Sequence, residues 1–216
     1  LRHYLKTSEH YRIRIMKSKI INFLEKKNKS KIVCLTSYSK SIAKILDDYC
    51  DLILVGDSLG NVLYGMENTH KVTLEMILRH AISVKKGVKK SLCIVDMPKN
   101  TYNNSRDAKK NARKILHITK CDGVKIESNK KNYSIIKKLV DSKIAVMGHI
   151  GYTPQYEKKF KVSGYSKSDE AKLIKEAKEI ERAGAFSIVL ECIASQTAKK
   201  ITKLLKIPTI GIGSSR

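Results

Sequence analysis

The chain has 216 residues, which suits one well-buried domain and is short for two. It carries 44 lysines and arginines against 20 acidic residues, a formal net charge of +24, but the lysines occur as scattered pairs and not as one tract. This dispersion argues against a specific nucleic-acid site and predicts only weak, non-specific attraction to anions. No apolar stretch approaches the roughly 20 residues that span a bilayer, so we expect no membrane partner.

Five cysteines are scattered along the chain, and none of them forms a C-x-x-C pair. Most lie inside or beside apolar runs, which is typical of small buried thiols in a reducing compartment. The spacing favours neither a disulfide framework nor a zinc site. We therefore expect a cytoplasmic protein.

The first fifteen residues, LRHYLKTSEHYRIRI, are basic and lack the apolar region of a secretory signal. Met16 and the helical-looking segment after it, KSKIINFLEKK, look more like a natural start. We therefore treat residues 1–15 as a basic N-terminal extension, either a leader or a boundary artefact. Residues 16–216 are predicted to form a single domain.

Short apolar runs, predicted to be strands, recur along the chain with helix-period segments between most of them. The predicted strands are Ile32–Tyr38, Leu52–Asp57, Leu92–Met97, Gly123–Glu127, Ile144–His149, Ser187–Glu191 and Pro208–Gly213. The predicted helices are Ser41–Tyr49, Thr73–Lys86, Asn111–Ile118, Tyr133–Val140, Asp169–Ala183 (with Ser168 as its N-cap) and Thr197–Leu205. Alternating strands and helices predict a parallel sheet with right-handed crossovers.

Two α/β architectures fit this alternation, a doubly wound open sheet and a (β/α)₈ TIM-type barrel. The glycine-rich pieces GDSLG and GIGSS give little support to a nucleotide-binding loop, because GDSLG lacks the G-x-G-x-x-G order and GIGSS ends the chain. Functional groups at the ends of many strands favour the barrel. With seven predicted strands, we expect a barrel truncated after its seventh strand, without its C-terminal strand and helices and with two exposed edges.

Four of the predicted strands end at or beside an acidic residue: Asp57, Asp96, Glu127 and Glu191. The carboxyl ends of parallel barrel strands meet at one rim, where active sites form. Several carboxylates on one rim repel one another unless they share a cation or a proton. The pattern therefore predicts an enzyme assisted by a metal ion.

The segments VGDSLGNVLYGMENTHKVTLEMILRH, IVDMP, GVKIE, MGHIGYTPQ, VLEC and IPTIGIGS follow one another in this order. From about Met16 onward they resemble the ketopantoate hydroxymethyltransferase family. The resemblance implies a (β/α)₈ barrel that transfers a hydroxymethyl group from 5,10-methylenetetrahydrofolate to 3-methyl-2-oxobutanoate. The product is 2-dehydropantoate, on the pathway to pantothenate and coenzyme A. The resemblance also implies a homo-oligomer, a decamer of pentameric rings.

By the same resemblance, Mg²⁺ or another divalent cation stabilises an enolate of the 2-oxo acid. Asp57 and Asp96 are implied to bind both the metal and the substrate, and Glu127 completes the metal environment. These hard oxygen donors suit a cation that keeps positions open for substrate and water.

Three further roles are implied away from the metal. Ser58 and Lys125 are substrate contacts, and Glu191 is the proton acceptor, which needs a raised pKa to act as a base. His149, in the GHIG segment, has two interpretations: it orients a ligand, or it is a hydrogen-bonded histidine of the core.

Two departures from the family pattern and two alternatives stay open. An acid expected after the first strand is replaced by Ser39, and the usual apolar residues after DMP are replaced by Lys99–Tyr102, which puts loop packing and folate affinity in doubt. One alternative is another metal-enolate enzyme, of the isocitrate-lyase or phosphoenolpyruvate-mutase type. The other is an inactive truncated barrel or a basic binding protein.

Overall fold

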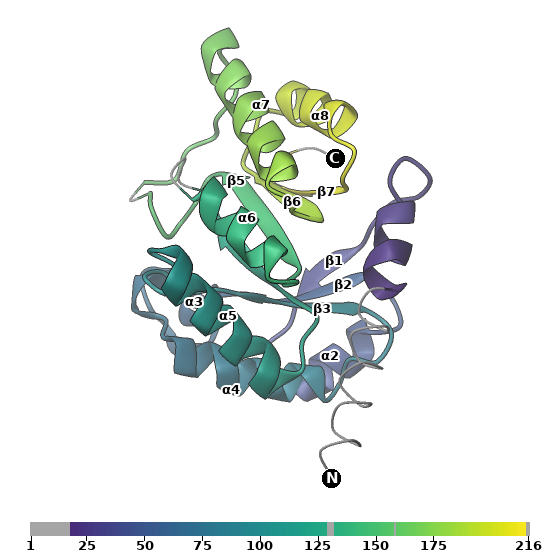
Figure 1. The fold of residues 1–216 in the computed structure, drawn as a ribbon, viewed down its shortest axis with the longest axis vertical. Helices are drawn as coiled ribbons and strands as arrows, with labels where there is room; N and C mark the ends of the chain where they lie inside the picture. Colours follow the sequence, from purple (N-terminus) through teal and green to yellow (C-terminus); the bar gives the residue numbers. More distant parts are fainter. Residues whose placement is uncertain (1–17, 129–131, 158, 215–216) are drawn as a thin grey trace.

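The strands of the protein form one parallel sheet in which each strand pairs with the next along the chain, from β1 to β7 (Figure 1). The computed structural model describes residues 18–128, 132–157 and 159–214, so the predicted extension 1–15 lies outside it. The strands are β1 (Cys34–Thr36), β2 (Leu52–Val55), β3 (Leu92–Asp96), β4 (Gly123–Glu127), β5 (Val146–Gly151), β6 (Ser187–Glu191) and β7 (Thr209–Ile212). The predicted α/β barrel class is thereby confirmed, as seven strands of a nearly closed barrel.

Helices cover the outside of this curved sheet, as the crossovers between parallel strands require (Figure 1). They are α2 (Lys40–Leu46), α3 (Leu59–Tyr64), α4 (Leu74–Lys85), α5 (Ser105–Thr119), α6 (Tyr133–Asp141), α7 (Lys167–Arg182) and α8 (Ser195–Leu204), with a short 3₁₀ turn η1 (Thr69–Lys71). Residues 18–25 are also helical. No helix in the described ranges is long and apolar enough to cross a membrane.

Two helix predictions need correction. Ser168 does not cap α7; the cap is Ser166, whose backbone is extended and whose side chain accepts a hydrogen bond from the Asp169 amide at 3.1 Å. The two acids that suggested a helix start, Asp169 and Glu170, do lie in the first turn. Helix α3 was not predicted, because its six residues are too few to show a helical period.

Alternation along the strands divides the core into two parts. Ile53, Val55 and Val95 pack outward against the helices, in the larger of the two clusters. Leu54 and Ile94, of opposite parity, face the inside of the barrel in the second cluster. Along β3 to β6 every second residue faces the inside of the barrel, and at the strand ends these inward-facing residues are the predicted site residues. On β3, for example, the inward-facing residues are Leu92, Ile94 and Asp96.

The inner cluster is closed at its lower end by Phe23, from the helical residues 18–25. Phe23 is 3% exposed and its ring meets Phe186 edge-on, with centroids 5.7 Å apart. An aromatic side chain from outside the sheet, Phe23, thus fills this end of the barrel interior.

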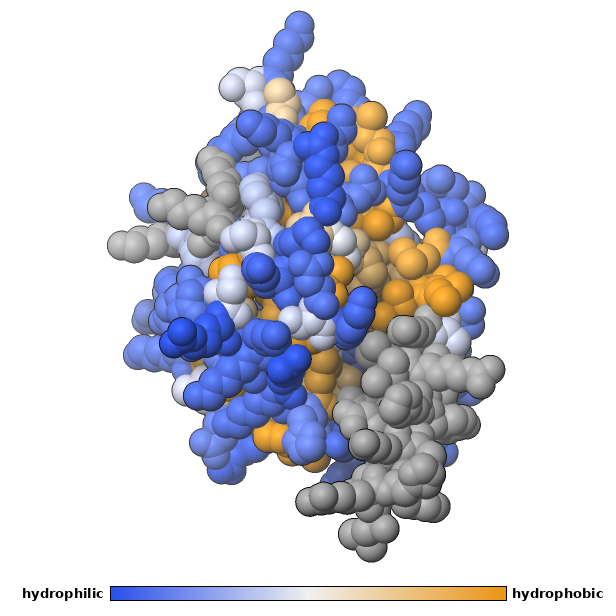
Figure 2. All heavy atoms as spheres, in the orientation of Figure 1, coloured by the Kyte–Doolittle hydropathy of each residue, from blue (hydrophilic) through white to orange (hydrophobic). Residues whose placement is uncertain are grey.

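The outer strands β1 and β7 keep one unpaired edge each within the described residues. Leu35 on β1 is 46% exposed and Ile212 on β7 is 44% exposed. Apolar surface is accordingly visible beside these strands in Figure 2. Both outer strands thus carry exposed apolar side chains in the described part of the chain.

Removing the Phe23 side chain should destabilise the barrel strongly. We expect Phe23→Ala to lower the free energy of unfolding by about 3–5 kcal/mol, the usual cost of emptying a buried aromatic site. Tyr165→Ala, at a side chain that is 80% exposed, is the matched control and should change it by less than about 0.5 kcal/mol. Urea unfolding measures both, and equal effects of the two variants would contradict the role of Phe23.

Candidate active site

Two aspartates meet at the carboxyl ends of β2 and β3. Asp96 ends β3, and its Oδ2 accepts a hydrogen bond from the backbone N–H of Asp57 at 3.0 Å. Gly56, just before Asp57, is closely packed, since an added Cβ would lie 2.8 Å from Ser58 Oγ and Ser58 would have to shift. Asp57 and Asp96 are both buried. The turn after β2 therefore brings both carboxylates to one place.

Lys125 supplies positive charge to this pair. It is Asp96's partner in the β3–β4 register, and its Nζ lies 2.5 Å from Asp96 Oδ1. Burial alone would lower the pKa of Lys125, but the carboxylates of Asp96, Asp57 and Glu127 raise it above its ordinary value. The side chain is 5% exposed. The buried acidic residues around Lys125 thus explain why a lysine stands within a buried strand.

Gln155 joins the ends of three strands, and the sequence analysis assigned it no role. Its backbone N–H donates to Glu127 Oε2 at 3.0 Å. Its side-chain Nε2 donates to Asp57 Oδ2 at 2.8 Å and to the Met97 carbonyl at 3.0 Å. The only sequence signal was its place in the TPQ block of a matched segment. Gln155 therefore fixes Asp57 and Glu127 relative to each other.

Tyr102 completes this network from the loop that departs from the family pattern. It is 2% exposed, and its hydroxyl donates to Gln155 Oε1 at 2.5 Å. The departure was expected to put loop packing in doubt. The structure shows the opposite for this residue, because the tyrosine is buried against the site and holds Gln155 in place.

If all three carboxylates here were ionised, Lys125 would compensate only one of their charges. Burial, together with nearby Asp96, raises the pKa of Asp57 to about 7, against the opposing effect of Lys125. Burial likewise raises the pKa of Glu127 well above its ordinary value. A hard divalent cation would relieve both effects.

The donor arrangement fits Mg²⁺ bound mainly by two aspartates. In the described ranges no group of three or more acidic, histidine or cysteine side chains converges as a ready metal cage. Asp57 and Asp96 are adjacent, whereas Glu127 is held by Gln155. Mg²⁺ commonly binds through one or two carboxylates and keeps its other positions for water and substrate. These residues therefore suit the cation, with Glu127 in a supporting position.

Glu191 lies at the end of β6, next to His149 of β5. The Glu191 side chain is 21% exposed, and its Oε2 is 3.1 Å from His149 Nε2. His149 Nδ1 is 3.8 Å from Glu127 Oε1. Burial and nearby Lys125 lower the pKa of His149, while Glu191 opposes them. The imidazole thus stands between two acidic residues of different strands.

Ser58 follows Asp57 at the start of α3, and its Oγ is 2.8 Å from the Tyr38 hydroxyl. Its side chain makes no capping hydrogen bond to the helix. The Ser58 hydroxyl therefore faces Tyr38 and does not cap the helix.

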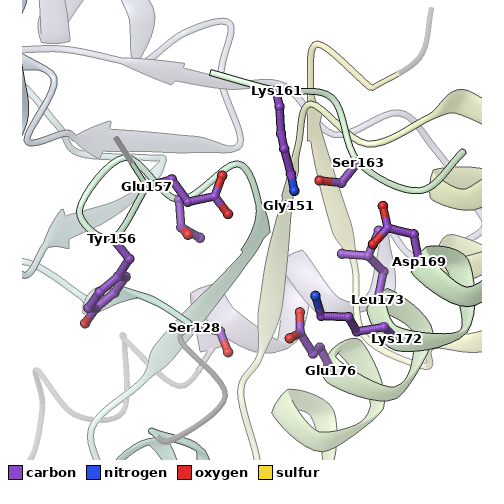
Figure 3. A pocket seen from close by; sticks show the side chains of 11 residues that line it. Ser128, Gly151, Tyr156, Glu157, Lys161, Ser163, Asp169, Lys172, Leu173 and Glu176 are labelled. Carbon is purple, nitrogen blue, oxygen red and sulfur yellow. The ribbon is translucent and has the colours of Figure 1, made fainter. Parts of the chain in front are cut away.

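A cavity of about 240 Å³ lies between the ends of β4 and β5 and helix α7 (Figure 3), and its lining includes none of the predicted site residues. Ser128, directly after Glu127, and Gly151, at the end of β5, form one wall. Lys161 points into the cavity in Figure 3. Space for a second ligand is therefore available next to the rim.

The family model for ketopantoate hydroxymethyltransferase matches residues 17–216. The chain belongs to this family. A 3-methyl-2-oxobutanoate hydroxymethyltransferase of Pelagibacter ubique is 56% identical over 200 residues, covering 93% of this chain and 78% of that protein. One of Anaplasma marginale is 45% identical over 199 residues, covering 91% and 72%.

Solved structures show the same fold at low identity. A 2,3-dimethylmalate lyase of the phosphoenolpyruvate mutase/isocitrate lyase superfamily matches with a TM-score of 0.68 and 15% identity, over 91% of this chain and 71% of that one. A phosphonopyruvate hydrolase, solved with oxalate and Mg²⁺, matches with a TM-score of 0.63 and 10% identity, over 91% and 80%. At such identity the likeness concerns the fold alone, so membership of the ketopantoate hydroxymethyltransferase family rests on the sequence.

The raised pKa of Asp57 gives the metal-free protein a defined pH dependence. The folded state holds the Asp57 proton more tightly than the unfolded chain does, so stability falls as the pH rises from about 4 to about 7. Asp57→Asn removes this titration. We expect the variant to gain on the order of 2–4 kcal/mol relative to the parent between pH 4 and pH 8. Urea unfolding in EDTA measures this, and a pH-independent difference would contradict it.

Proposed function

We propose that this chain transfers a hydroxymethyl group from 5,10-methylenetetrahydrofolate to 3-methyl-2-oxobutanoate, in the synthesis of pantothenate and coenzyme A. The observation that carries the proposal is a divided rim. Two aspartates and a lysine lie buried on β2 to β4, and a partly exposed glutamate lies apart from them on β6. In a family member, this division separates charge stabilisation from proton removal.

Asp57 and Asp96 would hold the divalent cation, with Glu127 supporting it. Bound Mg²⁺ supplies Lewis-acid polarisation of the substrate's 2-oxo group. The oxalate and Mg²⁺ of the phosphonopyruvate hydrolase of similar fold support a cation beside a small dicarbonyl acid. Gln155 keeps the Asp57 carboxylate in place through its amide hydrogen bond.

Lys125 and Ser58 receive the acidic substrate. The Lys125 ammonium, pressed against Asp96, supports the negative charge that develops on the 2-oxo oxygen. Ser58 has a hydroxyl that can donate to the substrate carboxylate while Tyr38 occupies its other side. These residues bind and orient the 2-oxo acid.

Glu191 removes the proton from C3 of the substrate. A base bound to the cation would lose basicity, so it must stand apart, as Glu191 does on β6. Its partial exposure leaves the carboxylate able to reach a ligand above the rim. One of the two C–N bonds of the donor's methylene carbon opens to give an iminium, and C3 attacks this carbon to form the new C–C bond. The second C–N bond is then cleaved with water, which supplies the hydroxyl oxygen, and tetrahydrofolate leaves with the proton on its nitrogen.

The cavity beside β5 would take the donor. Its wall includes Gly151, whose backbone is the register partner of Glu191 on the neighbouring strand β6. Lys161 offers a cation for the carboxylates at the glutamate end of the folate. Thr153 and Tyr156 add polar and aromatic surface for the rest of the molecule.

The protein would act in the cytoplasm as a homo-oligomer. All five cysteines are free thiols, which supports a reducing compartment. Helices α2 and α3 carry exposed apolar side chains, among them Ile45 at 61% and Val62 at 64%, which support contact with further copies.

Deuterium exchange tests the first half of the reaction without the donor. With Mg²⁺ the protein should exchange the C3 hydrogen of 3-methyl-2-oxobutanoate with solvent, as followed by NMR. Glu191→Gln should reduce the rate at least about 100-fold, because the amide cannot accept the proton. Glu157→Gln, at a carboxylate that lines the neighbouring cavity, is the control. Undiminished exchange by Glu191→Gln would remove Glu191 from the role of base.

The donor assignment predicts a different kinetic pattern. Lys161→Ala should raise the KM for methylenetetrahydrofolate about two- to fivefold, the loss expected for one exposed charge contact. The donor-independent exchange rate should stay within about twofold. Lys199→Ala, at an exposed residue of α8, is the control for lost positive charge. An equal loss of exchange in Lys161→Ala would mean that Lys161 serves the 2-oxo acid instead.

A further inference from the structure

The imidazole of His149 is buried without adequate hydrogen bonds. The side chain is 2% exposed, and neither ring nitrogen has a hydrogen-bond partner of good geometry in the described part of the chain. Leaving a buried polar atom unpaired costs roughly 1–3 kcal/mol. A carbon side chain would avoid this cost, so retaining the ring calls for a function.

The ring is placed between two acidic residues by the sheet register. His149 is paired with Glu127 across β4 and β5, and Gly151, two residues on, is paired with Glu191 across β5 and β6. The ring points inward by the same alternation as Met147. Nε2 is 3.1 Å from Glu191, whereas Nδ1 is 3.8 Å from Glu127, beyond hydrogen-bond distance.

The Glu191 carboxylate has few other constraints. Its backbone is held in the sheet, where the Tyr152 N–H donates to the Glu191 carbonyl oxygen at 2.8 Å. Its side chain, however, is 21% exposed and can change rotamer. Within the described ranges, His149 is the one side chain recorded at ion-pair or hydrogen-bond distance from this carboxylate.

We propose that His149 is a positioning residue whose Nε2–H donates to Glu191 Oε2 and thereby directs Oε1 toward C3 of the substrate. This inference rests on the proposed function. A small rotation of the ring or the carboxylate would align the 3.1 Å contact. Because a misplacement of about 1 Å can cost on the order of 100-fold in rate, one hydrogen bond is enough to matter.

Two substitutions at this position separate positioning from packing. His149→Gln keeps an amide N–H at a reach close to that of Nε2, and His149→Leu keeps volume without a donor. With Mg²⁺, we expect His149→Leu to lower kcat for deuterium exchange about 10- to 100-fold with KM within about threefold. His149→Gln should recover at least about tenfold of that loss. Equal losses in both variants, or a change confined to KM, would overturn the proposal.

The base variant supplies a further check. In a Glu191→Gln background, His149→Leu should cause no additional loss, because a residue acting only through Glu191 has nothing left to position. An independent further loss of tenfold or more would show that His149 acts on the substrate or the metal site directly, contrary to the proposal.

A spectroscopic measurement does not depend on activity. In protein labelled with ¹⁵N-histidine, the His149 resonances are those missing from His149→Gln. We expect a protonated Nε2 whose signal shifts when Glu191 is changed to Ala. A protein that shows this shift but no exchange would retain the contact and lose the proposed function. A protein that exchanges deuterium but shows an unprotonated Nε2 or no shift would overturn the inference alone.

Discussion

Burial of ionisable groups around Lys125 is the constraint on which the rest of the site depends. Lys125, Asp96 and Glu127 are each 5% exposed or less. Placing such ions away from water costs several kcal/mol each unless partners compensate. The Lys125–Asp96 contact compensates one charge, and hydrogen bonds from Gln155 support two more carboxylates. The raised pKa values of Asp57 and Glu127 reflect incomplete compensation, and a bound cation would complete it.

The barrel accommodates this imbalance through the alternation of its strands. On β3 the inward positions run Leu92, Ile94 and then Asp96, so apolar layers lie beneath a single polar layer. The inward positions of β5, Met147 and His149, repeat the change. The apolar layers have a low dielectric constant, which strengthens the electrostatic interactions of the polar layer next to them. It also raises the pKa of Asp57, so the apolar interior contributes directly to the chemistry of the rim.

The rim acids were predictable because each one stands at or just beyond the end of a strand that is apolar in the sequence. Asp96, Glu127 and Glu191 end β3, β4 and β6, whereas Asp57 lies two residues beyond the end of β2. Functional groups at the ends of several strands favoured the barrel over an open sheet. The contacts of Gln155 were not predictable, since its partner Asp57 lies 98 residues away and loop geometry alone brings them together. The same holds for the burial of Tyr102, a residue that the sequence marked only as a departure. The ends of strands can be read from the apolar pattern of the sequence, whereas contacts between loops leave no such pattern.

The similarity of fold to solved structures explains only part of the arrangement of residues on this rim. A lyase and a hydrolase share the barrel at 15% and 10% identity, and they carry out different reactions. A cation beside a carbonyl oxygen serves many reactions of 2-oxo acids, so the acids of β2 to β4 are compatible with several of them. What selects proton removal from C3 must therefore lie elsewhere on the rim. In this chain the opposite side carries Glu191 with His149 beside it, at 3.1 Å. That pair, set apart from the buried lysine and the aspartates, is where the specific chemistry of the family would be determined.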